Sequence, residues 1–224
     1  MLDLWTVLVP LIVGSAVVPV QIVATVVLLR SSFRTAAAWV GGMAAVRLVQ
    51  GILFGFVFSE VVVGSASSGG PGIVGSSLLL VFAVLFFVTA IRQVLAGDDS
   101  DAPPPKWTDK AESMSWPAAF GAGAGYVAVS PKFWVFTLGA IGAIADAGLG
   151  RAASAVTFIA FVALALSGNL AVLVLAAVSP SRSATALQAI VDWLQGNNRV
   201  ITIALGVVFG TWFLVKALSG FGLI

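Results

Sequence analysis

The chain has 224 residues, of which 60% are hydrophobic and only 9% are charged, with a formal net charge of +2. Soluble domains carry about 25% charged residues, so this composition indicates a helical membrane protein and gives no sign of nucleic-acid binding. The chain contains no cysteine and no histidine. Their absence excludes disulfides, thiol- or histidine-dependent catalysis, and thiolate- or imidazole-ligated zinc. We therefore predict no enzyme activity, no metal and no cofactor.

Six apolar stretches are long enough to cross a bilayer, because a spanning helix needs about 20 residues. They lie at residues 4–29, 36–58, 72–95, 116–145, 152–178 and 200–219. No basic residue precedes the first stretch, which predicts a retained span rather than a signal peptide. The predicted fold class is an all-α polytopic membrane protein with six transmembrane helices.

Basic residues between the spans predict the topology, since Lys and Arg mark cytoplasmic loops. The first, third and fifth connections and their flanks hold Arg30, Arg34, Arg92, Lys106, Lys110, Arg182 and Arg199. The opposite side holds Arg151 and Lys216. This asymmetry predicts a multi-pass plasma-membrane protein with both termini extracytoplasmic.

The longest connection, residues 96–115, contains the acidic and proline-rich stretch Asp98–Pro105. We predict a cytoplasmic linker there, joining a first three-helix repeat at 1–95 to a second at 116–224. Within the linker, Lys106–Met114 is predicted to form either a short interfacial helix or a disordered loop.

A proline interrupts the first span of each predicted repeat, Pro19 in one and Pro131 in the other. Proline removes a backbone donor and clashes with the preceding turn, so each helix should break and restart. At the second break Ser130 suits the N-cap position, Pro131 the first helical position, and Lys132 follows at once. Three spans per repeat make the second repeat inverted, and interrupted helices at matching positions of inverted repeats indicate a transport site.

Two basic residues, Arg47 and Lys132, lie well inside apolar spans, and no acidic residue lies at the same predicted depth. Counting helical rise from the cytoplasmic ends places Arg47 level with Pro19, near mid-bilayer. A basic residue there costs about 2.5–3.5 kcal/mol and needs a partner, a cavity or the protein interior. An anionic substrate would supply the partner; snorkelling, or binding to backbone carbonyls at the breaks, is the structural alternative.

Three amides, Gln21, Gln50 and Asn169, lie near the same depth and either line a substrate path or form helix–helix hydrogen bonds, the commoner role in membranes. Glycines at Gly41, Gly42, Gly121, Gly123 and Gly125 are expected to permit close helix packing. The lack of midplane carboxylates disfavours a metal-cation exporter.

Several short motifs resemble the peptidoglycolipid addressing protein (GAP) family, which is related to the sulfolipid addressing proteins and belongs to the LysE-type exporter superfamily. In the second half these are Pro105-Lys106-Trp107, Gly123, Val129–Lys132, Ala140–Leu149, Trp193-Leu194, Asn198, Gly206, Gly210 and Gly220. In the first half, Pro19 and Gly41 match more loosely. The family usually has Asn-Pro-Lys where this chain has Ser130-Pro131-Lys132, so an amide donor is missing at that position.

The resemblance implies a six-span, inverted-repeat protein that helps to move glycolipids of an actinobacterial envelope across the plasma membrane. It also implies action alongside a larger lipid exporter or a lipid synthase, and assembly as a homo-oligomer such as a dimer. Two alternatives remain open: an exporter of a small soluble metabolite such as an amino acid, and a non-transporting scaffold of a lipid export complex.

Overall fold

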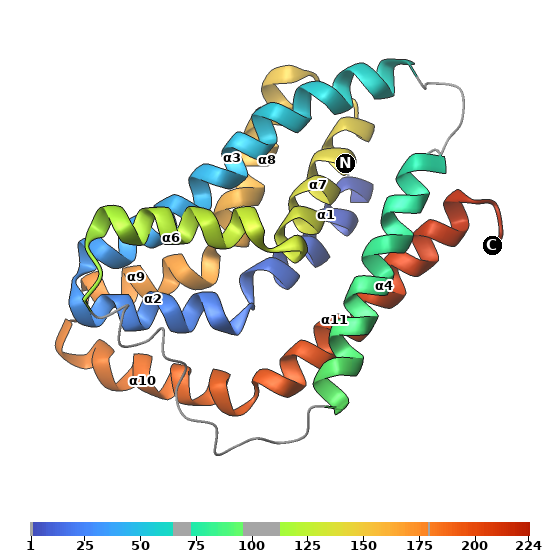
Figure 1. Ribbon diagram of the computed structural model, residues 1–224. Helices are drawn as coiled ribbons and strands as arrows, with labels where there is room; N and C mark the ends of the chain where they lie inside the picture. The colour runs from blue at the N-terminus through green and yellow to red at the C-terminus, as the bar shows by residue number, and fades with distance from the viewer. Residues whose placement is uncertain (1, 65–72, 96–112, 179) are drawn as a thin grey trace. The chain divides into compact units, whose positions relative to one another are not determined.

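A computed structural model describes residues 2–64, 73–95, 113–178 and 180–224, and these residues form ten helices and no strand (Figure 1). The chain divides into two compact units. The first comprises Met1–Val62 with Pro104–Leu194, and the second comprises Val63–Pro103 with Gln195–Ile224.

The first break lies between helices α1 (Leu2–Ala16) and α2 (Pro19–Ser31), whose axes differ by 49°. Pro19 is the first residue of α2 and follows Val18, which is extended (φ −69°, ψ 111°). Proline disfavours a helical conformation in the residue before it, and its fixed φ suits the start of a helix. The break therefore falls where the sequence predicts it.

The second break separates α6 (Trp116–Val129) from α7 (Pro131–Asp146), with a bend of 74° (Figure 1). Ser130 occupies the N-cap position with extended geometry, as predicted, but its side chain forms no capping hydrogen bond. Its carbonyl instead accepts a hydrogen bond from the Phe133 N–H at 3.1 Å. Backbone geometry and Pro131 thus start this helix without the predicted capping bond.

A third break, which the sequence did not predict, separates α8 (Arg151–Ala165) from α9 (Ser167–Val178) by 64°. No proline lies there. A Cβ added at Gly168 would lie 2.8 Å from the Ala16 carbonyl oxygen and 3.1 Å from Ile22 Cδ1. The third break therefore packs closely against the first.

The long helix α3 (Phe33–Gly64) crosses α6 through two glycines. A Cβ at Gly42 would collide with the Phe120 carbonyl oxygen, and one at Gly123 would collide with the Trp39 carbonyl oxygen. These two positions bear out the predicted role of glycine in close packing. Added Cβ atoms at Gly121 and Gly125 would meet no atom within 4 Å, and one at Gly41 only the ring of Phe120 at 3.9 Å.

Helix α10 (Pro180–Gly196) occupies the region that the sequence analysis treated as a connection between the last two spans. Leu187, Val191 and Leu194 are buried and recur at helical spacing, which gives the helix one apolar face. Gln188 on another face accepts a hydrogen bond from Arg30 Nη2 at 2.6 Å. The connection is therefore an amphipathic helix tied to the C-terminal end of α2.

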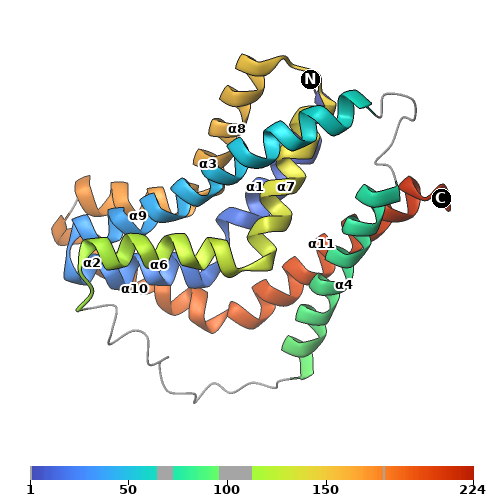
Figure 2. The ribbon, with the colours of Figure 1, turned by 45° about the horizontal axis from the view of Figure 1, so that its top comes forward.

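The second unit is built from α4 (Ile73–Leu95) and α11 (Asn198–Gly220), which lie side by side (Figures 1 and 2). Phenylalanine rings from both helices pack at centroid distances of 5.7–6.3 Å, namely Phe82 and Phe86 against Phe209 and Phe213. A Cβ at Gly206 would lie 2.6 Å from Ala90 Cβ, so this glycine permits the close contact. Arg199 donates to the carbonyls of Gln93 and Val94 and thereby satisfies acceptors at the end of α4.

Two helices in the described ranges, at Phe33–Gly55 and Asn198–Gly220, are long and apolar enough to cross a membrane. The number rises to five if each bent pair forms one span. Most of the predicted linker, residues 96–112, lies outside the described residues, and with it nearly all of the expected interfacial helix at Lys106–Met114.

Candidate functional site

Arg47 is fully buried on α3, with no solvent-exposed side-chain surface. Its Nη2 donates to Ser15 Oγ at 2.7 Å, at the end of α1. Its Cζ lies 5.0 Å from the ring centroid of Phe133 in the first turn of α7. Arg47 therefore connects the long helix α3 to both proline breaks.

The charge of Arg47 has no counter-ion among the side chains that the structure describes. Only two acidic side chains fall in that set, Asp146 and Asp192, and both are exposed near helix ends. Arg47 Nε and Nη1 are buried and find no hydrogen-bond acceptor among the described residues. Donors of a buried cation are costly to leave unpaired. An anion or a polar ligand that accepts hydrogen bonds from these nitrogens would therefore be stabilised here.

Lys132 is the second cation of this region. Its Nζ lies 5.2 Å from the centroid of the same Phe133 ring. Arg47 Cζ and Lys132 Nζ are therefore no more than about 10 Å apart, because each lies about 5 Å from one centroid. The negative face of an aromatic ring attracts cations but accepts no conventional hydrogen bond, so both side chains keep donors for a ligand.

Two aromatic residues that the sequence analysis did not select complete the site. Tyr126 on α6 packs against Phe133 at 5.2 Å and against Trp39 at 5.5 Å between ring centroids. The Tyr126 hydroxyl and Trp39 Nε1 are buried and lack a hydrogen-bond partner in the described part of the chain. The signal in the sequence was weak: Tyr126 is the only tyrosine, four residues before the break at Ser130.

Gln21 and Asn169 join the site through short hydrogen bonds. Gln21 Nε2 donates to the Ser15 carbonyl at 2.6 Å. Thr25 Oγ1 lies 2.9 Å from Asn169 Oδ1 and 2.8 Å from the Gln21 carbonyl, and its one proton serves one acceptor at a time. The bond between Thr25 and Asn169 links α2 to α9, which is the helix–helix role expected for such amides. Gln21 Oε1 and Asn169 Nδ2 stay unpartnered within the described ranges.

The remaining predicted residues are placed as follows. Gln50 is buried, three residues after Arg47, and neither of its amide atoms has a partner in the described structure. Pro19 is buried at the start of α2, whereas Pro131 is exposed at the start of α7 and Ser130 is partly exposed. Contacts thus bring together Arg47, Lys132 and Gln21, with Asn169 reached through Thr25.

We call the connected set the Arg47 cluster; it comprises Ser15, Gln21, Trp39, Arg47, Tyr126, Lys132 and Phe133. It offers hydrogen-bond donors and positive charge and has no carboxylate. No group of three acidic, histidine or cysteine side chains that could bind a metal occurs among the described residues. The cluster is therefore suited to binding a negative or polar group.

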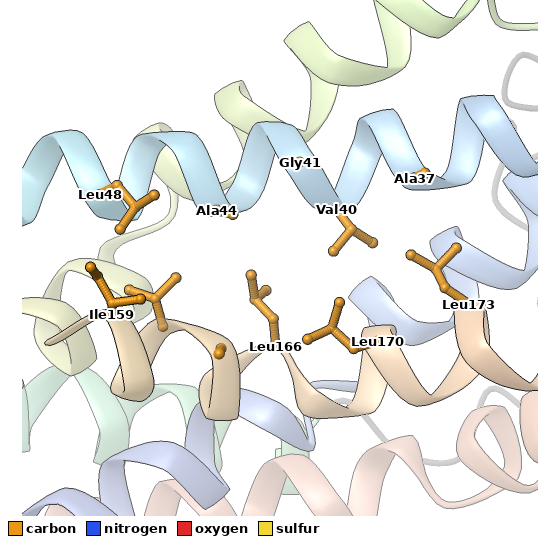
Figure 3. Close-up of a pocket in the computed structure, with 11 residues that line it drawn as sticks. Ala37, Val40, Gly41, Ala44, Leu48, Ile159, Leu166, Leu170 and Leu173 are labelled. Atoms are coloured by element: carbon orange, nitrogen blue, oxygen red, sulfur yellow. The ribbon is translucent and has the colours of Figure 1, made fainter. Parts of the chain in front are cut away.

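A groove of about 370 Å³ runs between α3 and the α8–α9 break (Figure 3). Its lining is entirely apolar: Ala37, Val40, Gly41, Ala44, Leu48, Ile159, Val162, Ala163, Leu166, Leu170 and Leu173. Both of its walls belong to helices that also carry buried polar residues, α3 with Arg47 and α9 with Asn169.

Apolar helices, proline-broken spans and a buried basic cluster define a helical membrane protein with an internal polar site. The chain belongs to the family described as Sap, sulfolipid-1-addressing protein (SfLAP), which matches residues 8–219. It is thus a member of a lipid-addressing family. No curated protein and no solved structure matches the chain.

Proposed function

We propose that this protein moves, or helps to move, a polar or anionic lipid of the cell envelope across the plasma membrane. One observation carries the proposal: Arg47 is fully buried, has no counter-ion among the described side chains, and leaves two guanidinium nitrogens without acceptors. Membership of a lipid-addressing family supports a lipid as the ligand.

In this proposal the lipid headgroup supplies the missing acceptor. Hydrogen bonds from a charged donor contribute about 1.5–3 kcal/mol each, and they are strongest to an ionised acceptor. Lys132 adds a second positive charge beside the Phe133 ring, and Gln21, Gln50 and Asn169 offer amide groups nearby. Ser130, Pro131 and Pro19 position the helix starts beside the headgroup.

The topology we propose has six spans. Five come from α3, α11 and the three bent pairs, and α4, whose apolar part is Leu79–Leu95, adds the sixth. Residues 1–95 and 116–224 form two inverted three-helix repeats joined by a cytoplasmic linker at 96–115, with both termini outside. The matching proline breaks at the starts of α2 and α7 support this arrangement.

We also propose that the protein is related to the peptidoglycolipid addressing proteins and to the LysE-type superfamily. It would act as a homo-oligomer together with a larger lipid exporter or a lipid synthase. The protein acts without enzymatic chemistry or a cofactor. An exporter of a small soluble metabolite would need a water-lined path, whereas the groove beside the Arg47 cluster is wholly apolar.

The test is surface lipidomics of cells carrying Arg47→Gln, Lys132→Gln or both, with Arg34→Gln as a control at an exposed arginine. We expect Arg47→Gln to lose about 1.5–3 kcal/mol of headgroup-binding free energy, so surface delivery of the lipid should fall about ten- to hundred-fold. Delivery is normalised to the amount of folded protein in the membrane. If Arg47→Gln does not fold, Arg47→Lys, which keeps the charge, is measured in its place. Wild-type delivery by Arg47→Gln and by Lys132→Gln would contradict the proposal.

A further inference from the structure

The groove between α3 and the α8–α9 break has a buried floor and an exposed rim. Val40, Val162 and Leu166 are at most 4% exposed, whereas Leu48 and Ile159 at the rim are 37% and 56% exposed. In Figure 3 the side chains of the two walls point toward one another across the groove. A ligand would therefore be held from both sides and would remain open to its surroundings along the rim.

The lining determines what can occupy this groove. None of its eleven residues has a polar side chain. An ordered water needs two to four polar partners, so these side chains cannot retain one. A sugar or a peptide would likewise lose its hydrogen bonds to water without replacement. A hydrocarbon chain is the ligand that this surface stabilises.

The length of the groove agrees with a single acyl chain. On α3 the lining runs from Ala37 to Leu48, and 11 residues rise about 16 Å along a helix. The hydrocarbon core of a bilayer is about 30 Å thick, so one leaflet measures about 15 Å. The groove therefore matches the reach of a chain that belongs to one leaflet.

The groove and the Arg47 cluster also share their walls. Arg47 directly precedes Leu48, about 100° around α3, and Asn169 directly precedes Leu170 on α9. Polar donors without partners thus lie one residue away from the apolar lining on both sides. We propose that the groove binds one acyl chain of the lipid whose headgroup occupies the Arg47 cluster; this inference rests on the proposed function.

The experiment uses the full chain in phosphatidylcholine vesicles with a trace of phosphatidic acid that carries a photoactivatable diazirine in mid-chain. Labelled residues are mapped by mass spectrometry after irradiation. We expect the groove-lining residues of α3, α8 and α9 to be labelled at least about five-fold more than positions on the opposite face of α8 such as Leu164, which is 43% exposed. Equal labelling of the groove and of those outward positions overturns the proposal.

Filling the groove provides the matched comparison. Ala44→Phe with Ala163→Phe should abolish the excess labelling, whereas Ala153→Phe, at an exposed position on the face of α8 away from the groove, should leave it unchanged. Retention of the excess labelling by folded filled protein also overturns the proposal. The unmodified chain alone tests the inference if the filled variant does not fold.

The two proposals fail in different ways. If the groove is unlabelled but Arg47→Gln lowers lipid delivery, the acyl-chain site is wrong and the proposed function stands. If Arg47→Gln and Lys132→Gln leave delivery at the wild-type level while groove labelling keeps its excess, the acyl-chain site stands and the headgroup assignment is wrong.

Discussion

Phe133 is the residue on which two cations converge, the buried Arg47 and the partly buried Lys132. Its ring lies 5.0 Å from Arg47 Cζ and 5.2 Å from Lys132 Nζ and is fully buried. A cation–π contact contributes about 0.5–1 kcal/mol when exposed and about 2 kcal/mol or more when desolvated. The ring therefore offsets part of the cost of two cations that have no carboxylate beside them in the described structure.

This role predicts an outsized cost for Phe133→Leu, which keeps an apolar side chain but removes the ring. Phe161→Leu is the matched control, because Phe161 is equally buried and also loses one aromatic partner, Phe158. We expect Phe133→Leu to lower the free energy of unfolding by about 1–2 kcal/mol more than the control, measured by thermal unfolding in detergent. Equal losses for the two variants would show that the ring contributes packing alone.

The site residues differ in how well the sequence indicated them. Arg47 and Lys132 are recognisable because a charge inside an apolar span needs a physical reason. Tyr126 and Trp39 are not, because aromatic residues in such spans commonly contact lipid or pack against one another. Only the fold shows that their polar atoms are buried without a partner in the described part of the chain.

Among the helices, the break between α8 and α9 depends on contacts between elements. The sequence predicts the breaks at Pro19 and Pro131 because the effect of proline is local. The third break has no proline and coincides with the close approach of Gly168 to the Ala16 carbonyl. Ser167, Gly168 and Asn169 are weak helix formers, which is the only local signal for a break at this position.

Gly168→Ala tests this contact between the two breaks. The added Cβ would lie 2.8 Å from a backbone oxygen that cannot rotate away, so we expect a lower melting temperature. Gly121→Ala serves as the control because an added Cβ there meets nothing within 4 Å. Alanine is the better helix former by about 1 kcal/mol, so the control should be neutral or stabilising. Equal melting temperatures for both variants would count against close packing of the breaks.

For the molecule as a whole, the amphipathic helix α10 suggests how the protein lies relative to the membrane surface. Its buried residues Leu187 and Val191 lie on one face, Ile190 is 39% exposed at the edge of that face, and Asp192 lies on the polar side. Since the buried residues pack within the protein, the exposed edge at Ile190 is the part that can meet acyl chains, and we expect α10 to lie along the boundary between headgroups and acyl chains. From the sequence, residues 179–199 are predicted only as a connection between the last two spans.

Because the chain has no cysteine, single spin labels can test this placement without background. With Ile190→Cys in vesicles we expect the label to be more accessible to oxygen than to a water-soluble nickel complex. With Asp192→Cys, the paired control, the order should reverse. If both labels favour the nickel complex equally, α10 does not lie in the interface.

The fully buried arginine also restricts how cargo could be released. Arginine keeps its proton throughout the physiological range, and the chain has no histidine to change charge between about pH 5 and 8. Acidification on one side of the membrane would therefore leave the positive centre in place. Under the proposed function, departure of the headgroup requires movement of α3 or of the broken helices, so the directionality of delivery depends on conformation rather than on titration of this site.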